Sequence, residues 1–79
     1  MPGQYESLEK GLYVIEKTRE LGRMTVAILA LAPGWNKANA SRYLSFLAQS
    51  GWVERVNSKG FPVYVLGRKA LHMAVDLAL

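Results

Sequence analysis

The amino-acid sequence predicts a mainly helical α+β domain, in which three helices are followed by a small β-hairpin and a closing helix. Three observations predict it. Three segments within residues 6–50 have helical patterns of apolar residues. The pattern changes to strict alternation around a cluster of turn residues between residues 52 and 66. From residue 67 onward, apolar residues again recur at helical spacing. Because the chain has only 79 residues, we expect a single domain over residues 1–79.

The first predicted helix covers residues 6–21 and follows a loose tail at residues 1–5. Leu8, Leu12 and Ile15 recur at helical spacing, so we expect them to form its buried stripe. Three further apolar residues fall outside that stripe and predict a second apolar face, which a partner can cover: Tyr13, Val14 and Leu21.

The second predicted helix, residues 26–32, is short and apolar on all sides, so we expect it to be mostly buried. Thr25 can cap its N-terminus, and residues 23–25 can form a strand with a single rung. Pro33-Gly34 ends the helix and turns the chain. Trp35 is then expected to be buried just ahead of the next helix.

The third predicted helix, residues 37–50, combines an apolar back with a polar, basic front. Asn36 is a good N-cap, because its side-chain oxygen can accept from a free N–H group of the first turn. Gly51 stands where a left-handed residue ends a helix. The buried stripe is predicted to contain Ala40, Leu44, Leu47 and Ala48. Two helices joined by a tight, glycine-containing turn predict a helix-turn-helix.

The hairpin is predicted from strands at residues 52–56 and 61–66, joined by a turn at residues 57–60. Pro62 cannot donate a ladder hydrogen bond, which favours an edge position or a strand start. Because a two-stranded hairpin is not stable alone, it must pack on the helices. Trp52, at its start, is expected to hold the end of the third helix on the core.

The closing helix is predicted over residues 67–79, with Leu71, Val75 and Leu79 along one side. Taken together, these elements predict a winged helix-turn-helix. It would have a three-helix core, a hairpin wing over residues 52–66 and a C-terminal helix.

The composition excludes several classes of protein. There is no cysteine, which excludes disulfides and thiolate chemistry. His72 is the only histidine, and the sequence contains no catalytic Ser-His-acid pattern and no Gly-rich phosphate loop. We therefore expect no enzyme, no metal and no cofactor. The start of the chain does not resemble a signal peptide, and no apolar stretch is long enough to span a bilayer, so we expect a cytoplasmic protein without a membrane partner.

The charge distribution points to a polyanionic partner. The formal net charge is +4 and the sequence pI is about 9.7. Four of the six acidic residues lie within the first twenty positions, whereas residues 21–69 contain seven basic residues and one acidic residue. A basic body of this kind is typical of nucleic-acid binding, although small proteins are also basic for solubility alone.

The front of the third helix supplies the candidate DNA contacts. Arg42 points away from the buried stripe, and its guanidinium group can bind guanine O6 and N7 or a phosphate. Asn39 can pair with adenine, while Ala38 and Ser41 are small enough for close approach. In the wing, basic side chains can meet the DNA backbone or the minor groove. The predicted contacts are Lys37, Ala38, Asn39, Ser41, Arg42, Ser45, Arg55 and Lys59.

Three segments resemble the IclR-type bacterial transcription regulators. Residues 7–12 (SLEKGL) are similar to the family's opening, residues 37–44 (KANASRYL) to its recognition helix, and residues 64–71 (YVLGRKAL) to its wing strand and linker helix. The resemblance covers about residues 7–73. It implies sequence-specific binding of double-stranded DNA by a homodimer, and a transcription regulator that we expect to be a repressor, associated with the nucleoid when it is bound.

Two departures from the family pattern limit what the resemblance implies. The family's larger effector-binding domain is missing, so we expect no small-molecule effector site in this chain. The chain is either an excised domain or a small stand-alone regulator. Asn36 and Asn39 stand where proline and a small hydroxyl residue are more usual, so no base preference carries over.

The rival hypothesis is a winged-helix adaptor, which binds another protein in a larger assembly. An adaptor does not need a small, polar and basic front on its third helix, so the sequence favours DNA binding. Because one such module covers only a short half-site, a two-fold dimer is expected, with its terminal helices packed together.

Overall fold

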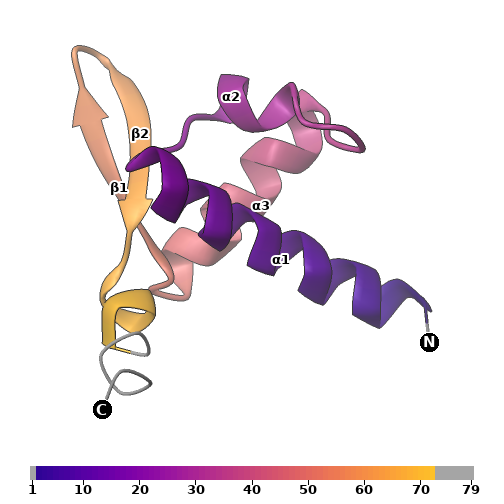
Figure 1. The fold of residues 1–79 in the computed structure, drawn as a ribbon. Helices are drawn as coiled ribbons and strands as arrows, with labels where there is room; N and C mark the ends of the chain where they lie inside the picture. The colour runs from indigo at the N-terminus through magenta and orange to yellow at the C-terminus, as the bar shows by residue number, and fades with distance from the viewer. Residues whose placement is uncertain (1, 73–79) are drawn as a thin grey trace.

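The structure is a computed structural model that describes residues 2–72, with side chains from residue 6 onward. It contains the helices α1 (Pro2–Leu21), α2 (Val26–Ala30) and α3 (Lys37–Gln49), followed by the strands β1 (Val53–Ser58) and β2 (Phe61–Leu66) (Figure 1). Residues 68–72 are again helical. The α+β winged helix-turn-helix predicted from the sequence is therefore confirmed. The remainder of the predicted closing helix, including Val75 and Leu79, lies outside the described residues.

Helix α1 differs from the prediction in its start and in the side that it buries. It begins at Pro2 instead of after a loose tail, and proline suits a first helical turn, where its missing N–H group has no helical partner. Val14 and Thr18 are fully buried, whereas Leu8 and Leu12 are 60% and 55% exposed. The expected buried stripe is therefore wrong for Leu8 and Leu12, whereas its third member, Ile15, is half-buried against the core.

The buried side of α1 escaped the sequence pattern because one of its two central residues is polar. The Thr18 hydroxyl donates to the Val14 carbonyl oxygen at 2.7 Å, so no polar group is left unsatisfied when this side enters the core. Once bonded to its own helix, threonine packs much as valine does. Val14, counted as part of a second face, therefore belongs to the central core.

The link between α1 and α2 is tied to the hairpin. The Met24 N–H donates to the Tyr64 carbonyl oxygen and the Tyr64 N–H donates to the Met24 carbonyl oxygen, both at 2.7 Å. Both side chains are buried in the core. The predicted single-rung strand is confirmed, and it joins β2 on the edge that β1 does not occupy.

Helix α2 is capped as predicted but is less buried than expected. The Ile28 N–H donates to the Thr25 hydroxyl oxygen at 3.1 Å. Of its side chains only Leu29 is buried, and Leu31, just past its end, is 87% exposed. The expectation of burial on all sides is wrong, because a helix of five residues at the surface can turn only one side toward α3.

Helix α3 begins where the sequence predicts and ends one residue earlier. The Asn39 N–H donates to the Asn36 side-chain oxygen at 2.8 Å, and Gly51 has the left-handed φ of 87° that ends such a helix. Ala40, Leu44 and Leu47 are buried, as expected, and Ala48 is half-buried.

The hairpin is antiparallel, with Val53 opposite Leu66 and Ser58 opposite Phe61. Its turn is only Lys59-Gly60, shorter than the predicted 57–60, and both residues have positive φ (51° and 91°). A two-residue turn with this backbone matches the twist of the strands, and Asn-Gly is its usual sequence. Lysine in a left-handed conformation costs about 1–2 kcal/mol.

The end of α3, the start of β1 and the closing helix meet at one corner. The Gly67 N–H donates to the Trp52 carbonyl oxygen at 2.8 Å, and the Trp52 N–H donates to the Leu47 carbonyl oxygen at 2.9 Å. Trp52 is half-buried and packs against the core, as expected, and the Lys69 ammonium group lies 5.8 Å from its ring centroid. A Cβ atom at Gly67 would collide with the backbone of Gly51 and Trp52.

We therefore expect Gly67→Ala to destabilise the domain by about 1–3 kcal/mol, because the backbone at this corner must move to admit a methyl group. Urea unfolding followed by circular dichroism measures the change. Gly11→Ala is the matched control, since a Cβ atom there meets nothing within 4 Å and alanine is the better helix former. Equal unfolding midpoints for Gly67→Ala and the parent protein would contradict the close contact.

Candidate nucleic-acid interface

The side of α3 opposite its buried stripe is polar, and most of its side chains are small. Helical spacing places Arg42 near the centre of this side, and the flanking side chains are exposed. Of the predicted contacts on this helix, only Asn39 is half-buried. The exposed ones are Lys37, Ala38, Ser41, Arg42 and Ser45.

Asn39 lies on the flank of α3 that faces α1. Its backbone N–H is already bonded to Asn36, and it stands four residues before Tyr43, which packs against Trp35. The side chain of Asn39 is therefore less free to reach outward than that of Arg42. Arg42 has the largest reach on the exposed side of the helix.

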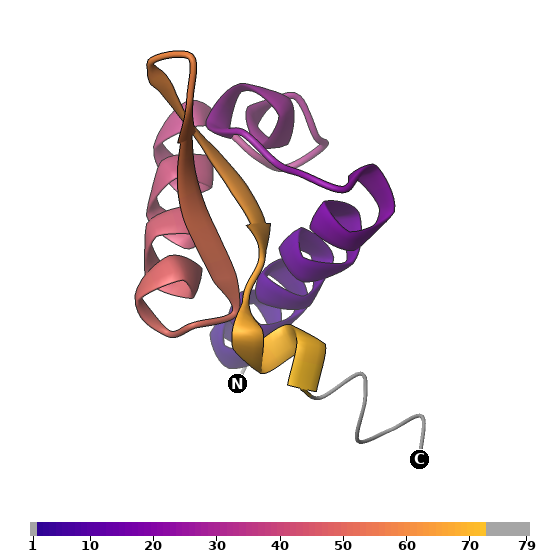
Figure 2. The same cartoon turned by 90° about the vertical axis from the view of Figure 1, so that its left-hand side faces the viewer.

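The hairpin stands beside α3. Figure 2 shows α3 and the hairpin on one side of the molecule and α1 on the other, with the hairpin tip extending past the body of the domain. Arg55 and Lys59, the two predicted contacts of the wing, are exposed. α3 contains two basic residues and no acidic one, and the hairpin contains two basic residues and one acidic one, whereas the four glutamates of α1 outnumber its three basic residues, so the positive charge lies mainly on the side of α3 and the hairpin.

An aromatic cluster joins α1 to the N-terminal half of α3. The ring of Trp35 stacks on that of Tyr13, with centroids 6.1 Å apart, and meets the ring of Tyr43 edge-on at 5.1 Å. The ammonium groups of Lys10 and Lys17 lie 5.5 Å and 5.7 Å from the ring centroids of Trp35 and Tyr13. Trp35 is half-buried by these contacts, not fully buried as expected.

Lys17 in this cluster also pairs with an acid. Its ammonium group donates to the Glu20 carboxylate at 3.1 Å, and this hydrogen bond, together with the charge of Glu20, raises the pKa of Lys17 above its ordinary value. Lys17 thus contacts both the Glu20 carboxylate and the ring of Tyr13 with the same ammonium group.

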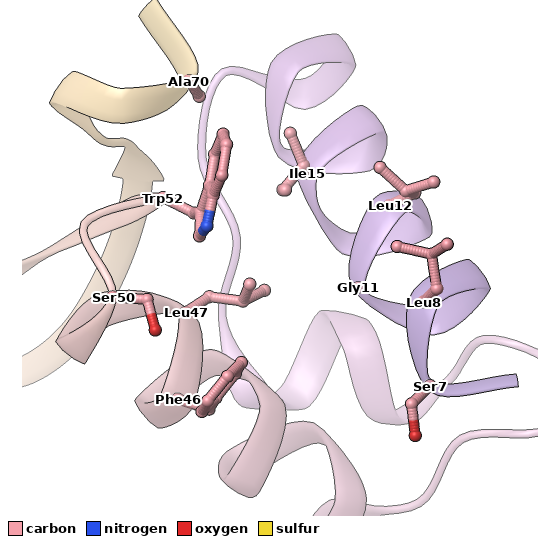
Figure 3. Close-up of a pocket in the computed structure, with 10 residues that line it drawn as sticks. All are labelled: Ser7, Leu8, Gly11, Leu12, Ile15, Phe46, Leu47, Ser50, Trp52 and Ala70. Atoms are coloured by element: carbon pink, nitrogen blue, oxygen red, sulfur yellow. The ribbon is translucent and has the colours of Figure 1, made fainter. Parts of the chain in front are cut away.

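A groove between α1 and the C-terminal end of α3 was missed by sequence reasoning. It has a volume of about 660 Å³. Leu8 and Leu12 on one wall face Phe46 and Trp52 on the other, and Phe46 is exposed (Figure 3). The pattern in the sequence that indicates this groove is the predicted apolar stripe of Leu8 and Leu12, because these two residues line the groove instead of the core. The lining residues are Ser7, Leu8, Gly11, Leu12, Ile15, Phe46, Leu47, Ser50, Trp52 and Ala70.

Other kinds of site are not found in the described part of the chain. Among residues 2–72, no group of three His, Asp or Glu side chains is arranged to hold a metal ion. His72 is exposed on the closing helix. None of the helices within residues 2–72 has the length and hydropathy needed to cross a membrane.

Trp35→Ala should destabilise the domain by about 2–3 kcal/mol, somewhat below the range for a fully buried tryptophan, because Trp35 keeps part of its surface in water. The substitution removes both aromatic contacts, each worth roughly 0.5–1.5 kcal/mol. Trp35→Phe retains a ring and should cost about half as much. Urea unfolding measures both, and a Trp35→Ala protein with the parent's midpoint would show that the cluster does not hold α3 on α1.

A sequence model of a known protein family matches more than half of the chain. The model described as the IclR helix-turn-helix domain matches residues 7–57, which begin in α1 and end in β1. The match therefore includes both helices of the helix-turn-helix and the first strand of the wing. No curated protein and no solved structure matches the chain.

Proposed function

Because this chain belongs to the IclR helix-turn-helix domain family, a family of DNA-binding domains of transcription regulators, we propose that it binds double-stranded DNA sequence-specifically with α3 in the major groove. The observation that carries the proposal is the exposed side of α3, which is basic, small and free of acidic residues. The major groove, about 12 Å wide, admits a helix with such a surface.

Arg42 is the residue that we propose for base recognition. It is exposed near the centre of the polar side, and the small side chains of Ala38, Ser41 and Ser45 around it let the helix approach the base edges. Its guanidinium group can bind guanine O6 and N7 in a bidentate manner. We propose that Lys37, in the first turn, contacts a phosphate and that Asn39 contacts a base at the edge of the interface.

The hairpin is proposed to supply affinity that does not depend on sequence. Arg55 and Lys59 are exposed on it, and such cations neutralise phosphates on either side of the groove that α3 occupies. A domain bound in this way blocks access to its site, so we propose that the protein acts as a repressor. In the cell it would be cytoplasmic and associated with the nucleoid.

We propose that the protein binds its operator as a two-fold dimer whose contact is the groove of Figure 3. Leu8, Leu12 and Phe46, all more than half exposed, gather at this groove, and apolar surface concentrated in this way is typical of an interface. The contact differs from the one expected from the sequence, because Tyr13 and Val14 are engaged within the domain.

The groove also supports a second candidate function, that of an adaptor whose groove takes an apolar segment of another protein. The adaptor hypothesis makes no use of Arg42 or of the basic hairpin. DNA binding and its dependence on Arg42 therefore distinguish the two functions.

Arg42→Ala should weaken binding to a duplex selected by the wild-type protein from a random pool by about 1–3 kcal/mol, and should relax preference at one base pair. Fluorescence anisotropy at fixed salt measures the affinity. Arg19→Ala is the matched control, since it removes the same charge from an exposed position on α1. If Arg42→Ala binds as tightly as Arg19→Ala while both remain folded, α3 does not read the bases through Arg42.

The dimer should be abolished by Leu12→Glu but not by Leu21→Glu. The two leucines lie on the same helix and are 55% and 56% exposed, but only Leu12 lines the groove. Sedimentation at tens of micromolar, with and without a palindromic duplex, measures the assembly. The half-sites should lie about 10 base pairs apart or a multiple of that. A wild-type protein that stays monomeric and binds the palindrome one-to-one is inconsistent with this dimer.

A further inference from the structure

The outer edge of β1 carries backbone groups that point away from the rest of the hairpin. The N–H and C=O groups of Tyr64 bond to Met24, and Tyr64 lies opposite Arg55 in the ladder. Arg55 and Tyr64 therefore form a non-hydrogen-bonded pair, and the backbone groups of Arg55 point to the outer edge of β1. Alternation gives the backbone groups of Asn57 the same direction. Within residues 2–72, these groups of Arg55 and Asn57 bond to no other backbone group.

The position of Pro62 supports this assignment. Pro62 lies opposite Asn57, and proline is tolerated in a ladder where its missing N–H group would point outward. Asn57 and Pro62 thus form a second pair without hydrogen bonds between the strands. Figure 1 shows β1 as the outer strand of the hairpin, with β2 between it and α1. An uncovered edge strand of six residues is able to pair with a further strand.

The face of the hairpin opposite Tyr64 is apolar at its centre. Val56 lies opposite Val63, and both side chains point away from the face of Tyr64. Phe61 shares the face of Val63, because side chains two positions apart along a strand point the same way. Val56 and Phe61 are 44% and 54% exposed. β-branched and aromatic side chains of this kind stabilise a sheet when they lie side by side on neighbouring strands.

We propose that β1 pairs antiparallel with β1 of a second copy of this chain, about a two-fold axis at Val56, so that two hairpins join into one continuous sheet. In this register Val56 lies opposite its own counterpart, and Arg55 lies opposite Asn57 of the second copy. Arg55 and Asn57 exchange both backbone hydrogen bonds, because the groups of both residues point to the shared edge. A row of valines, Val63 and Val56 from each copy, then crosses the sheet.

The charged residues of β1 select this register. A centre at Glu54 or Arg55 places like charges directly opposite each other. A centre at Asn57 places Arg55 opposite Lys59 of the second copy. Like charges in opposing positions are destabilising, so among residues 54–57 the centre at Val56 is the one that avoids them. Charges on an edge strand usually prevent pairing, but here they exclude the wrong registers and leave this one open.

This contact uses a different surface from the groove of Figure 3. Because it joins two strand edges only, it is weak and forms at concentrations well above those of the groove dimer, or between copies that are already held close together. Two different two-fold contacts on one protomer join dimers into larger assemblies. The β1 contact therefore couples neighbouring dimers. This coupling rests on the dimer proposed above, whereas the pairing of β1 itself does not.

Because the chain contains no cysteine, a single cysteine at residue 56 tests the pairing directly. The Cα atoms of a non-hydrogen-bonded pair lie about 4.5 Å apart, within the range of about 4.4–6.8 Å that a disulfide needs. Val56→Cys should therefore form a covalent dimer in a glutathione buffer at hundreds of micromolar, measured by mass spectrometry. Asn57→Cys is the matched control, because its counterpart lies two residues, or about 7 Å, further along the strand. Leu31→Cys, at a residue that is 87% exposed, measures random collision.

An equimolar mixture of Glu54→Cys and Ser58→Cys tests the register. Since Glu54 lies opposite Ser58 of the second copy, the mixed dimer should exceed both homodimers. Charge at residue 57 tests the same contact without cysteine. Asn57→Glu places a carboxylate opposite Arg55 of the second copy, whereas Asn57→Lys places an ammonium group there. In a Leu12→Glu background, which removes the groove dimer, the two association constants should differ by about three- to tenfold, measured by sedimentation at hundreds of micromolar.

The outcomes distinguish this inference from the proposed function. Cross-linking of Val56→Cys that persists with Leu12→Glu supports a contact separate from the groove. Cross-linking that requires an intact Leu12 shows that the groove alone brings the strands together, and it overturns the β1 contact. Equal cross-linking of Val56→Cys, Asn57→Cys and Leu31→Cys also overturns it, as does a mixture without excess mixed dimer. None of these failures affects DNA binding through α3. A cross-linked β1 pair in a protein that forms no other contact overturns the groove dimer alone.

Discussion

The pair of hydrogen bonds between Met24 and Tyr64 is the contact on which the arrangement of α3 and the hairpin depends. A hairpin of two six-residue strands is not stable alone, and these bonds fasten β2 to the link between α1 and α2. Both side chains are buried in the core that also holds Leu44 of α3. The position of the hairpin relative to α3 is therefore set within the core and does not depend on the surface.

Different elements of the fold give the domain surfaces of different chemical character. Helix α3 and the hairpin present basic and small polar side chains, α1 presents four glutamates, and the groove between α1 and α3 is apolar. The side of α3 and the hairpin is therefore the more positive one, whereas α1, which also carries Lys10, Lys17 and Arg19, is close to neutral. The apolar groove, between α1 and the C-terminal end of α3, is the surface at which we propose that a second copy binds.

The sequence predicts α3 best, because all the signals of this helix are local. The Asn36 cap, the glycine at residue 51 and the Ala40–Leu44–Leu47 stripe each depend on neighbours within one or two turns, and each is present in the structure. The same holds for Thr25 and for the placement of Lys59 at the hairpin tip. The exposure of the predicted α3 contacts other than Asn39 follows from the same periodicity.

What the sequence determined by itself is thus the order of the elements, their caps and the polar side of α3, since these follow from local hydrogen bonding and periodicity. Only the tertiary structure decided which side of α1 is buried. Leu8 and Leu12 are more apolar than Thr18, but burial depends on the shape of the neighbouring helices, and a hydroxyl bonded to its own helix removes the cost of burying threonine. The groove likewise forms only because three segments distant in the sequence come together: α1, the end of α3 with Trp52, and the closing helix at Ala70. No local sequence pattern can predict such a contact.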